Sequence, residues 1–174
     1  LCGLVLKDWI EGELRDVRVV AWASIGFGLL LYVADRIGRR IRAIEAVGLR
    51  DALFVGAFQA LALIPGTSRS GATMTAGLFG GLTRRAAAHY SFLLSIPLIA
   101  AAGALKARDL LALPSASLDW GVLGVGVALS AVSAYLCIDV FLRLVERLGM
   151  TPFVVYRVLL GVATAASYAG YMLT

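Results

Sequence analysis

A short polar run, Pro65-Gly66-Thr67-Ser68-Arg69-Ser70-Gly71, interrupts a chain whose long stretches are otherwise apolar. Hydroxyl groups donate hydrogen bonds, glycines let backbone N–H groups turn toward one point, and arginine presents a planar fork of donors that matches phosphate oxygens. No aspartate or glutamate lies between Asp51 and Asp109, so the neighbouring sequence offers Arg69 no carboxylate partner. The run therefore predicts a binding site for a phosphate or diphosphate.

The residues of the run divide by the chemistry that they offer. Arg69 would neutralise negative charge on a phosphoryl group, and Ser68 is either a phosphate ligand or, given a base, a nucleophile. No base stands beside Ser68 in the sequence, which favours the ligand role. The residues expected to hold the anion are Gly66, Thr67, Ser70, Gly71 and Thr73. A structural alternative, in which these residues only cap a half-helix and allow close helix packing, leaves Arg69 without a role.

The composition indicates a membrane protein. Hydrophobic residues make up 60% and charged residues 16% of the 174 residues, against about 45–50% and about 25% in soluble domains. A spanning helix needs about 20 mostly apolar residues. Four segments meet this need, namely residues 17–34, 86–105, 118–142 and 153–174. We therefore predict an all-α membrane protein, a polytopic helical bundle that forms one integral-membrane domain over residues 1–174.

Two further apolar stretches, residues 52–64 and 72–82, flank the polar run and are too short to span. Short apolar segments broken by proline and glycine are typical of a re-entrant hairpin, which enters the membrane, turns at mid-depth and leaves on the same side. We predict such a hairpin over about residues 51–83. The basic connector at residues 36–50 would then share the cytoplasmic side with Arg84 and Arg85, in keeping with the positive-inside rule.

Other charged residues are interpreted against this arrangement. The net charge of +5 comes largely from the clustered arginines of the connector, which favours a juxtamembrane role over nucleic-acid binding. Asp139 and Arg157 lie in apolar spans, and we expect them to snorkel to the interface or to pair with each other. His89, the only histidine, is interpreted as an interfacial or packed residue rather than a general base.

Two known phosphate-binding patterns do not match the polar run. Gly66-x4-Gly71-Ala72-Thr73 has the spacing of a P-loop, but Ala72 stands where the lysine belongs, and the flanking segments are apolar spans. The lipid-phosphatase superfamily related to phosphatidate phosphatases has a histidine six residues after its arginine, where this chain has Thr75.

The run FQALALIPGTSRSGATMTAGLFGGLTRRAAAHYSFLLSIP closely resembles the undecaprenyl-diphosphatase family of bacterial inner membranes, also known as bacitracin-resistance proteins, in its Pro-Gly-x-Ser-Arg-Ser-x-Ala-Thr signature. The upstream RIGRRIRAIEAVGLRDAL resembles the family's basic connector. The resemblance covers essentially the whole chain. It implies hydrolysis of undecaprenyl diphosphate to the monophosphate, dependence on a divalent cation (Mg²⁺ or Ca²⁺), and two inverted repeats that each hold a re-entrant hairpin. The signature residues fall on Ser68, Arg69, Ser70 and Thr73.

The family's other motif, a Glu-x-x-x-Glu pair followed by a turn with Ser and His, is not reproduced here, and Glu11 and Glu13 have the wrong spacing. We therefore expect the C-terminal part of a longer inverted-repeat protein, with no metal ligands in this chain and no activity when isolated. The expected partners are a polyprenyl diphosphate lipid and the bilayer, not nucleic acid, and a homodimer stays open. The alternative function is an anion or lipid-phosphate transporter or flippase with the same re-entrant architecture.

Overall fold

The structure is a computed structural model that describes residues 16–111 and 119–173 of the chain. Most of the described residues are helical, and the one β-type pairing among them is an isolated bridge between Arg42 and Leu82. The elements, in chain order, are α3 (Val17–Ile37), the 3-10 helix η1 (Ile44–Ala46), α4 (Leu49–Leu61), α5 (Arg69–Phe79), α6 (Arg84–Leu111), α7 (Trp120–Leu148) and α8 (Thr151–Leu173). The prediction of an all-α fold is confirmed.

Four of the described helices are long and apolar enough to cross a membrane, namely Val17–Ile37, Arg84–Leu110, Trp120–Leu148 and Thr151–Tyr171. Each contains most of a predicted span, so the prediction of a multi-pass membrane protein is confirmed. α7 continues past the predicted end of its span through Arg143 and Arg147, because a helix does not have to stop where its apolar stretch ends.

The two remaining α-helices, α4 and α5, hold 13 and 11 residues. At 1.5 Å per residue they are about 20 and about 17 Å long, which is short of the roughly 30 Å hydrocarbon core of a bilayer. They pack against each other as a helical hairpin around the polar run. Neither is long enough to span alone, as the apolar stretches predicted.

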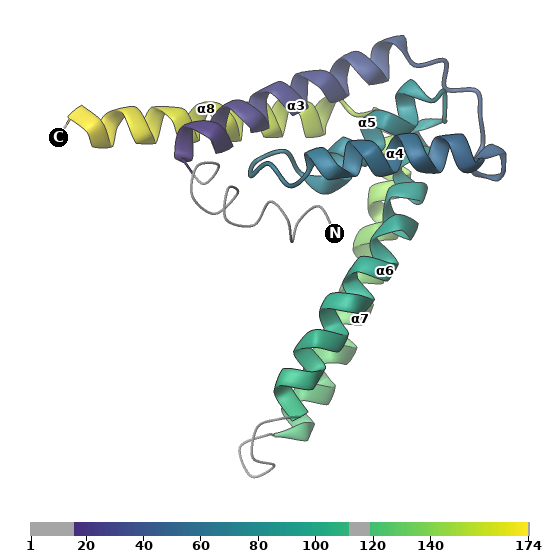
Figure 1. Cartoon of the computed structure of the whole chain (residues 1–174), viewed down its shortest axis with the longest axis vertical. Helices are drawn as coiled ribbons and strands as arrows, with labels where there is room; N and C mark the ends of the chain where they lie inside the picture. The colour runs from purple at the N-terminus through teal and green to yellow at the C-terminus, as the bar shows by residue number, and fades with distance from the viewer. Residues whose placement is uncertain (1–15, 112–118, 174) are drawn as a thin grey trace.

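The helices are arranged as two pairs that meet at this hairpin. α3 and α8 lie side by side, and α6 and α7 form a second pair that projects away from the first (Figure 1). α5 contacts α3, α4 and α6, and its residues from Gly71 to Leu78 are all buried. Small side chains permit this close packing, since a Cβ on Gly77 would lie 3.0 Å from Ala87 of α6. The hairpin is therefore placed by contacts with distant parts of the chain.

Arg42 in the connector ties together both ends of the hairpin. Its guanidinium donates to the two carboxylate oxygens of Asp51 in α4, at 2.8 and 2.7 Å. It also donates to the carbonyl of Gly80 after α5, at 2.8 Å. The hydrogen bonds of Arg42 lower the pKa of Asp51 to about 2, and the Gly48 N–H, which donates to the same carboxylate, adds to the effect. The ionised Asp51 is thus part of the clamp that closes the hairpin.

Acidification is expected to weaken this clamp. Because the pKa of Asp51 is lower in the folded protein, its contribution is complete above about pH 4 and is lost as the pH falls through about 2. Asp51→Asn should lower the thermal unfolding midpoint of detergent-solubilised protein at about pH 5, and the gap to wild type should shrink toward about pH 2. Asp109→Asn, at an exposed carboxylate, is the control. A gap independent of pH would contradict this role of Asp51.

A second ion pair joins the end of α3 to the start of α6. Asp35 is only 1% exposed and accepts hydrogen bonds from Arg84 Nε at 2.6 Å and Nη2 at 2.9 Å. Arg40 of the connector lies 3.9 Å from the same carboxylate. The structure thus brings the connector and the basic pair at residues 84 and 85 to one end of the hairpin.

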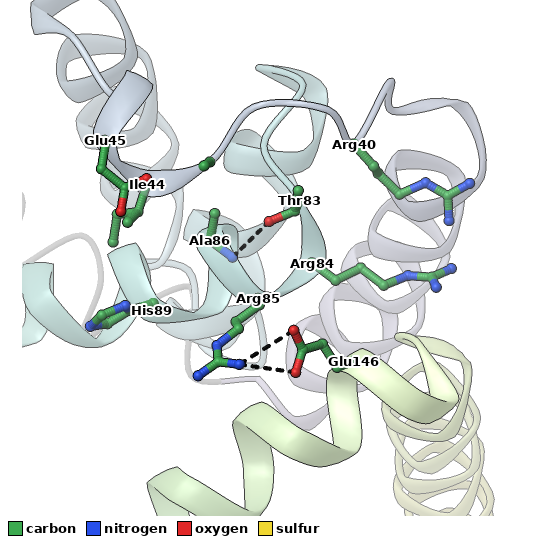
Figure 2. A pocket seen from close by; sticks show the side chains of 10 residues that line it. Arg40, Ile44, Glu45, Thr83, Arg84, Arg85, Ala86, His89 and Glu146 are labelled. Carbon is green, nitrogen blue, oxygen red and sulfur yellow. Dashed lines mark hydrogen bonds and ion pairs between the residues drawn. The ribbon is translucent and has the colours of Figure 1, made fainter.

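Arg84→Ala is expected to lower the free energy of unfolding by about 3 kcal/mol, because it leaves a buried carboxylate without its main partner. Arg85→Ala is a matched control at the next residue. Arg85 pairs with Glu146 at 3.1 Å (Figure 2). Because both side chains are about half exposed, the loss of this pair should cost less than about 1 kcal/mol. Chemical denaturation of both variants in one detergent measures the difference, and equal losses would refute the assignment.

Candidate anion-binding site

The turn between α4 and α5 is fixed against α3 at Gly66. Gly66 has φ 92°, a left-handed conformation that glycine adopts without steric cost. A Cβ here would collide with the backbone carbonyl of Val20 in α3. The carbonyl of Gly66 accepts a hydrogen bond from Ser24 Oγ of α3 at 3.1 Å. Backbone conformation and close packing therefore both require glycine at this position.

Arg157 of α8 binds the same turn. Its Nη2 donates to the carbonyl of Gly66 at 2.8 Å and to the carbonyl of Thr67 at 2.7 Å. Its Nη1 is buried and has no hydrogen-bond partner in the part of the chain that the structure describes. This atom lies against Gly71, where a Cβ would collide with it. Arg157 thus joins α8 to the turn and to the first turn of α5.

The prediction that Arg157 snorkels or pairs with Asp139 is wrong. Asp139 instead pairs with Arg143 one turn along α7, at 2.9 Å. The physical reason lies in the break between α4 and α5, which leaves carbonyl oxygens without helical partners. A nearby guanidinium gains charge-assisted hydrogen bonds from them, and such bonds are strong where water is scarce.

Ser68, the residue that caps the N-terminus of α5, has a strained backbone. Ser68 has φ 61° and ψ 115°, a region sparsely populated by residues with a Cβ, at a cost on the order of 1–3 kcal/mol. Its Oγ accepts a hydrogen bond from the Gly71 N–H at 3.4 Å and lies 3.4 Å from Ser70 Oγ. The backbone N–H groups of Arg69 and Ser70 have no acceptor among the described residues. The start of α5 therefore offers hydroxyl and N–H donors of the kind that bind anions at helix N-termini.

The guanidinium of Arg69 has no ion pair or hydrogen bond with any residue in the described ranges, and the side chain is partly exposed. Its position as the first residue of α5 places it beside the free N–H groups. An arginine in this state keeps all its donors available to a ligand. Its role as a phosphate ligand stays a prediction.

Two of the predicted ligands, Thr67 and Thr73, are buried. Thr67 Oγ1 has no hydrogen-bond partner among the described residues. The Thr73 hydroxyl lies 2.7 Å from Ser91 Oγ of α6 and donates within its own helix, to the carbonyl of Arg69 at 3.0 Å or of Ser70 at 3.1 Å. In this arrangement Thr73 joins α5 to α6, and the part that either threonine takes in binding an anion stays a prediction.

A cavity of about 190 Å³ lies beside the turn and gathers part of the predicted set. Ser68, Ser70 and Gly71 line it together with Arg157. The remaining lining residues are apolar or aromatic, namely Leu31, Met74, Phe141, Met150, Phe153 and Tyr156. Gly66, Thr67, Arg69 and Thr73 do not line this cavity. The structure therefore brings three of the predicted residues to one space and adds a cation from α8.

A larger cavity of about 620 Å³ lies at the other end of the hairpin, between the connector, α6 and α7 (Figure 2). His89 is exposed and lines this cavity, not the one beside the turn. Among the basic residues that line this cavity, Arg40 and Arg84 pair with Asp35, and Arg85 pairs with Glu146. Because each of these arginines already has a carboxylate partner, this cavity is a weaker candidate for the anion site.

The residues at the turn do not fit a divalent cation. Within the described ranges, no group of three or more His, Cys, Asp or Glu side chains is placed to hold a metal ion, and none of the residues lining the smaller cavity is acidic. Mg²⁺ and Ca²⁺ bind carboxylate and carbonyl oxygens, whereas the turn presents N–H groups, hydroxyls and guanidinium groups. This donor set matches an anion.

Sequence reasoning missed Arg157 as a site residue, although a signal was present. An arginine in an apolar span is costly unless it has a partner or lines a polar space, and Arg157 lies in such a span. The partner of Arg157 could not be chosen from the sequence, because the turn carbonyls lie about 90 residues away.

The fold and the site together define a polytopic helical membrane protein in which a turn with two serines and one arginine joins two short helices. The chain belongs to the family described as bacitracin resistance protein BacA, whose family model matches residues 1–163.

Several curated relatives are similar over most of this chain. Undecaprenyl-diphosphatase 2 of Stutzerimonas stutzeri is 51% identical over 173 residues, which are 98% of this chain and 64% of the relative. Undecaprenyl-diphosphatase of Teredinibacter turnerae is 52% identical over 93% of this chain and 61% of the relative. That of Hahella chejuensis is 53% identical over 92% of this chain and 60% of the relative. The chain thus spans somewhat less than two thirds of the length of these relatives.

Proposed function

We propose that the protein hydrolyses undecaprenyl diphosphate to undecaprenyl phosphate and phosphate, and so recycles the lipid carrier for cell-envelope synthesis in the bacterial inner membrane. The observation that carries the proposal is the Ser68-Arg69-Ser70 turn at the start of α5, in a chain about half identical to proteins named undecaprenyl-diphosphatase. The names of these relatives favour hydrolysis over the transporter alternative.

The donors at the start of α5 suit the terminal phosphate of such a lipid. The free N–H groups of Arg69 and Ser70 and the hydroxyls of Ser68 and Ser70 would bind its oxygens, and the Arg69 guanidinium would neutralise the charge that remains. As the terminal phosphoryl group transfers to water, donors fixed in advance around its oxygens would stabilise the negative charge that these oxygens carry in the transition state. Arg157 acts as a positioning residue, because it holds the carbonyls of the turn.

Hydrolysis also needs a base for the attacking water. Among the residues that the structure describes, no carboxylate or histidine lines the cavity beside the turn. The relatives are longer than this chain, and we propose that the base and the ligands of the divalent cation that the family resemblance implies belong to the remaining part of the protein. Ser68 is then a phosphate ligand rather than the nucleophile.

The α4–α5 hairpin is proposed to be re-entrant, with its tip near the middle of the bilayer and its two ends on the cytoplasmic side. The lengths of the two helices support this, as does the clamp by which Arg42 joins both hairpin ends to the basic connector. A chain that turns at mid-depth needs partners for its open backbone groups, and Ser24 and Arg157 provide them for Gly66 and Thr67.

The decisive experiment measures phosphate release from undecaprenyl diphosphate by the full-length protein in detergent with a divalent cation. Release at a rate that scales with protein concentration is the expected result. Binding of the lipid without release would refute hydrolysis. Movement of the lipid diphosphate between the leaflets of proteoliposomes, again without phosphate release, would favour the transporter or flippase.

A further inference from the structure

The cavity beside the turn has two walls of different chemistry. Ser68, Ser70 and Gly71, at the proposed phosphate site, form a polar wall together with the positioning residue Arg157. The facing wall is apolar and aromatic and comes from four different helices, α3, α5, α7 and α8. A phosphate would not occupy the apolar part, since moving an anion next to hydrocarbon without donors is strongly unfavourable.

The apolar wall is built from side chains that are held in place. The ring of Phe141 lies between those of Phe92 and Phe153, with ring centroids 5.5 and 4.8 Å apart. Leu31, Met74 and Met150 also line the cavity and are at most 5% exposed. Because Ser68 and Tyr156 are exposed, the cavity runs from the surface of the chain to its core.

The size of the cavity limits what this wall accepts. Its volume is about 190 Å³, which corresponds to about six water molecules at the roughly 30 Å³ that each occupies in the liquid. One isoprene unit, with four carbons in line and one methyl branch, is a group of similar size. A longer piece of hydrocarbon would have to continue past Tyr156 to the membrane.

We infer that this cavity binds the first isoprene unit of the substrate, the unit joined directly to the diphosphate, and that it selects a branched, unsaturated chain over a straight one. The inference rests on the proposed function. In a prenyl diphosphate the first carbon is bonded to a phosphate oxygen, so a diphosphate held at Ser68 and Ser70 places that unit beside the apolar wall. The methyl branch and the double bond then pack against Phe141, Phe153 and Met74.

The test compares kcat/KM of the full-length protein for two lipids, a short prenyl diphosphate and a straight-chain alkyl diphosphate with the same number of carbons, in mixed micelles. Wild type should prefer the prenyl lipid. Leu31→Phe fills part of the cavity and Phe153→Leu removes part of the aromatic wall. Each substitution should lower the ratio of kcat/KM for the prenyl lipid to kcat/KM for the straight-chain lipid about ten-fold, mainly by lowering the value for the prenyl lipid. An effect of about this size is expected when one carbon group fits poorly in an apolar pocket.

Phe58→Leu is the matched control. Phe58 is half-buried in α4, contacts Phe54 with ring centroids 5.0 Å apart and does not line the cavity. The Phe58→Leu variant should therefore have the same ratio of the two kcat/KM values as wild type. Leu31→Phe places a larger side chain in the core and can prevent folding. If it does, the test rests on Phe153→Leu alone. The inference is overturned, while the proposed function stands, if wild type has equal kcat/KM for the two lipids. It is also overturned if the cavity variants lower kcat/KM equally for both lipids. No phosphate release from either lipid by wild type would overturn both.

Discussion

Full-length protein carrying Arg69→Ala is expected to release phosphate from undecaprenyl diphosphate about a thousand-fold more slowly than wild type. Arg69 has no partner among the described residues and stands beside the free N–H groups at the start of α5. Removing a single fixed donor from a charge-stabilising site costs about 10²–10³ in rate, and removing an arginine that neutralises a transferring phosphoryl group costs about 10³–10⁵. The measurement is kcat and KM with the protein in detergent.

The stability of the protein should change little in Arg69→Ala, because the side chain makes no ion pair or hydrogen bond in the described part of the chain. Arg50→Ala is the matched control. It removes the same charge from an exposed position in the first turn of α4 and should retain the wild-type rate. Full activity in Arg69→Ala would move the phosphate site away from the start of α5.

Arg157→Met is expected to impair both stability and activity. The substitution keeps an apolar stem of similar length but removes the donors to the carbonyls of Gly66 and Thr67. Hydrogen bonds from charged groups contribute about 1.5–3 kcal/mol each, so the free energy of unfolding should fall by about 3 kcal/mol. Activity should fall about 100-fold in the fraction that remains folded, because a shift of about 1 Å in the turn is enough for such a loss.

The pattern across two substitutions separates a positioning role from general destabilisation. Arg157→Lys has a single ammonium in place of the planar fork and should recover part of the stability but little of kcat. Arg143→Met in α7 is the control, since Arg143 is 73% exposed and pairs with a half-exposed Asp139, and a change below about 1 kcal/mol is expected. Loss of stability with an unchanged kcat in Arg157→Met would show that the turn does not depend on Arg157 for its catalytic geometry.

Much of the fold followed from local sequence. The lengths of the apolar stretches predicted the four membrane-capable helices, and Pro65-Gly66 between two short stretches predicted the break between α4 and α5. The apolar segments did not predict where helices end. α7 runs on to Leu148, because charged residues at a membrane surface remain compatible with helical backbone.

The sequence by itself determined the chemical character of the site, a turn with two serines, an arginine and glycines and without a carboxylate. Those residue types are adjacent in the chain, so their proximity needs no folding. Only the tertiary structure decided which groups face the cavity and which turn inward. Arg157 and Ser24 come from helices that lie about 90 and about 40 residues from the turn, and Thr73 bonds to Ser91 of a third helix. Which donor meets which carbonyl depends on how those helices pack, and that packing depends on small side chains in close contact rather than on any periodicity within one segment.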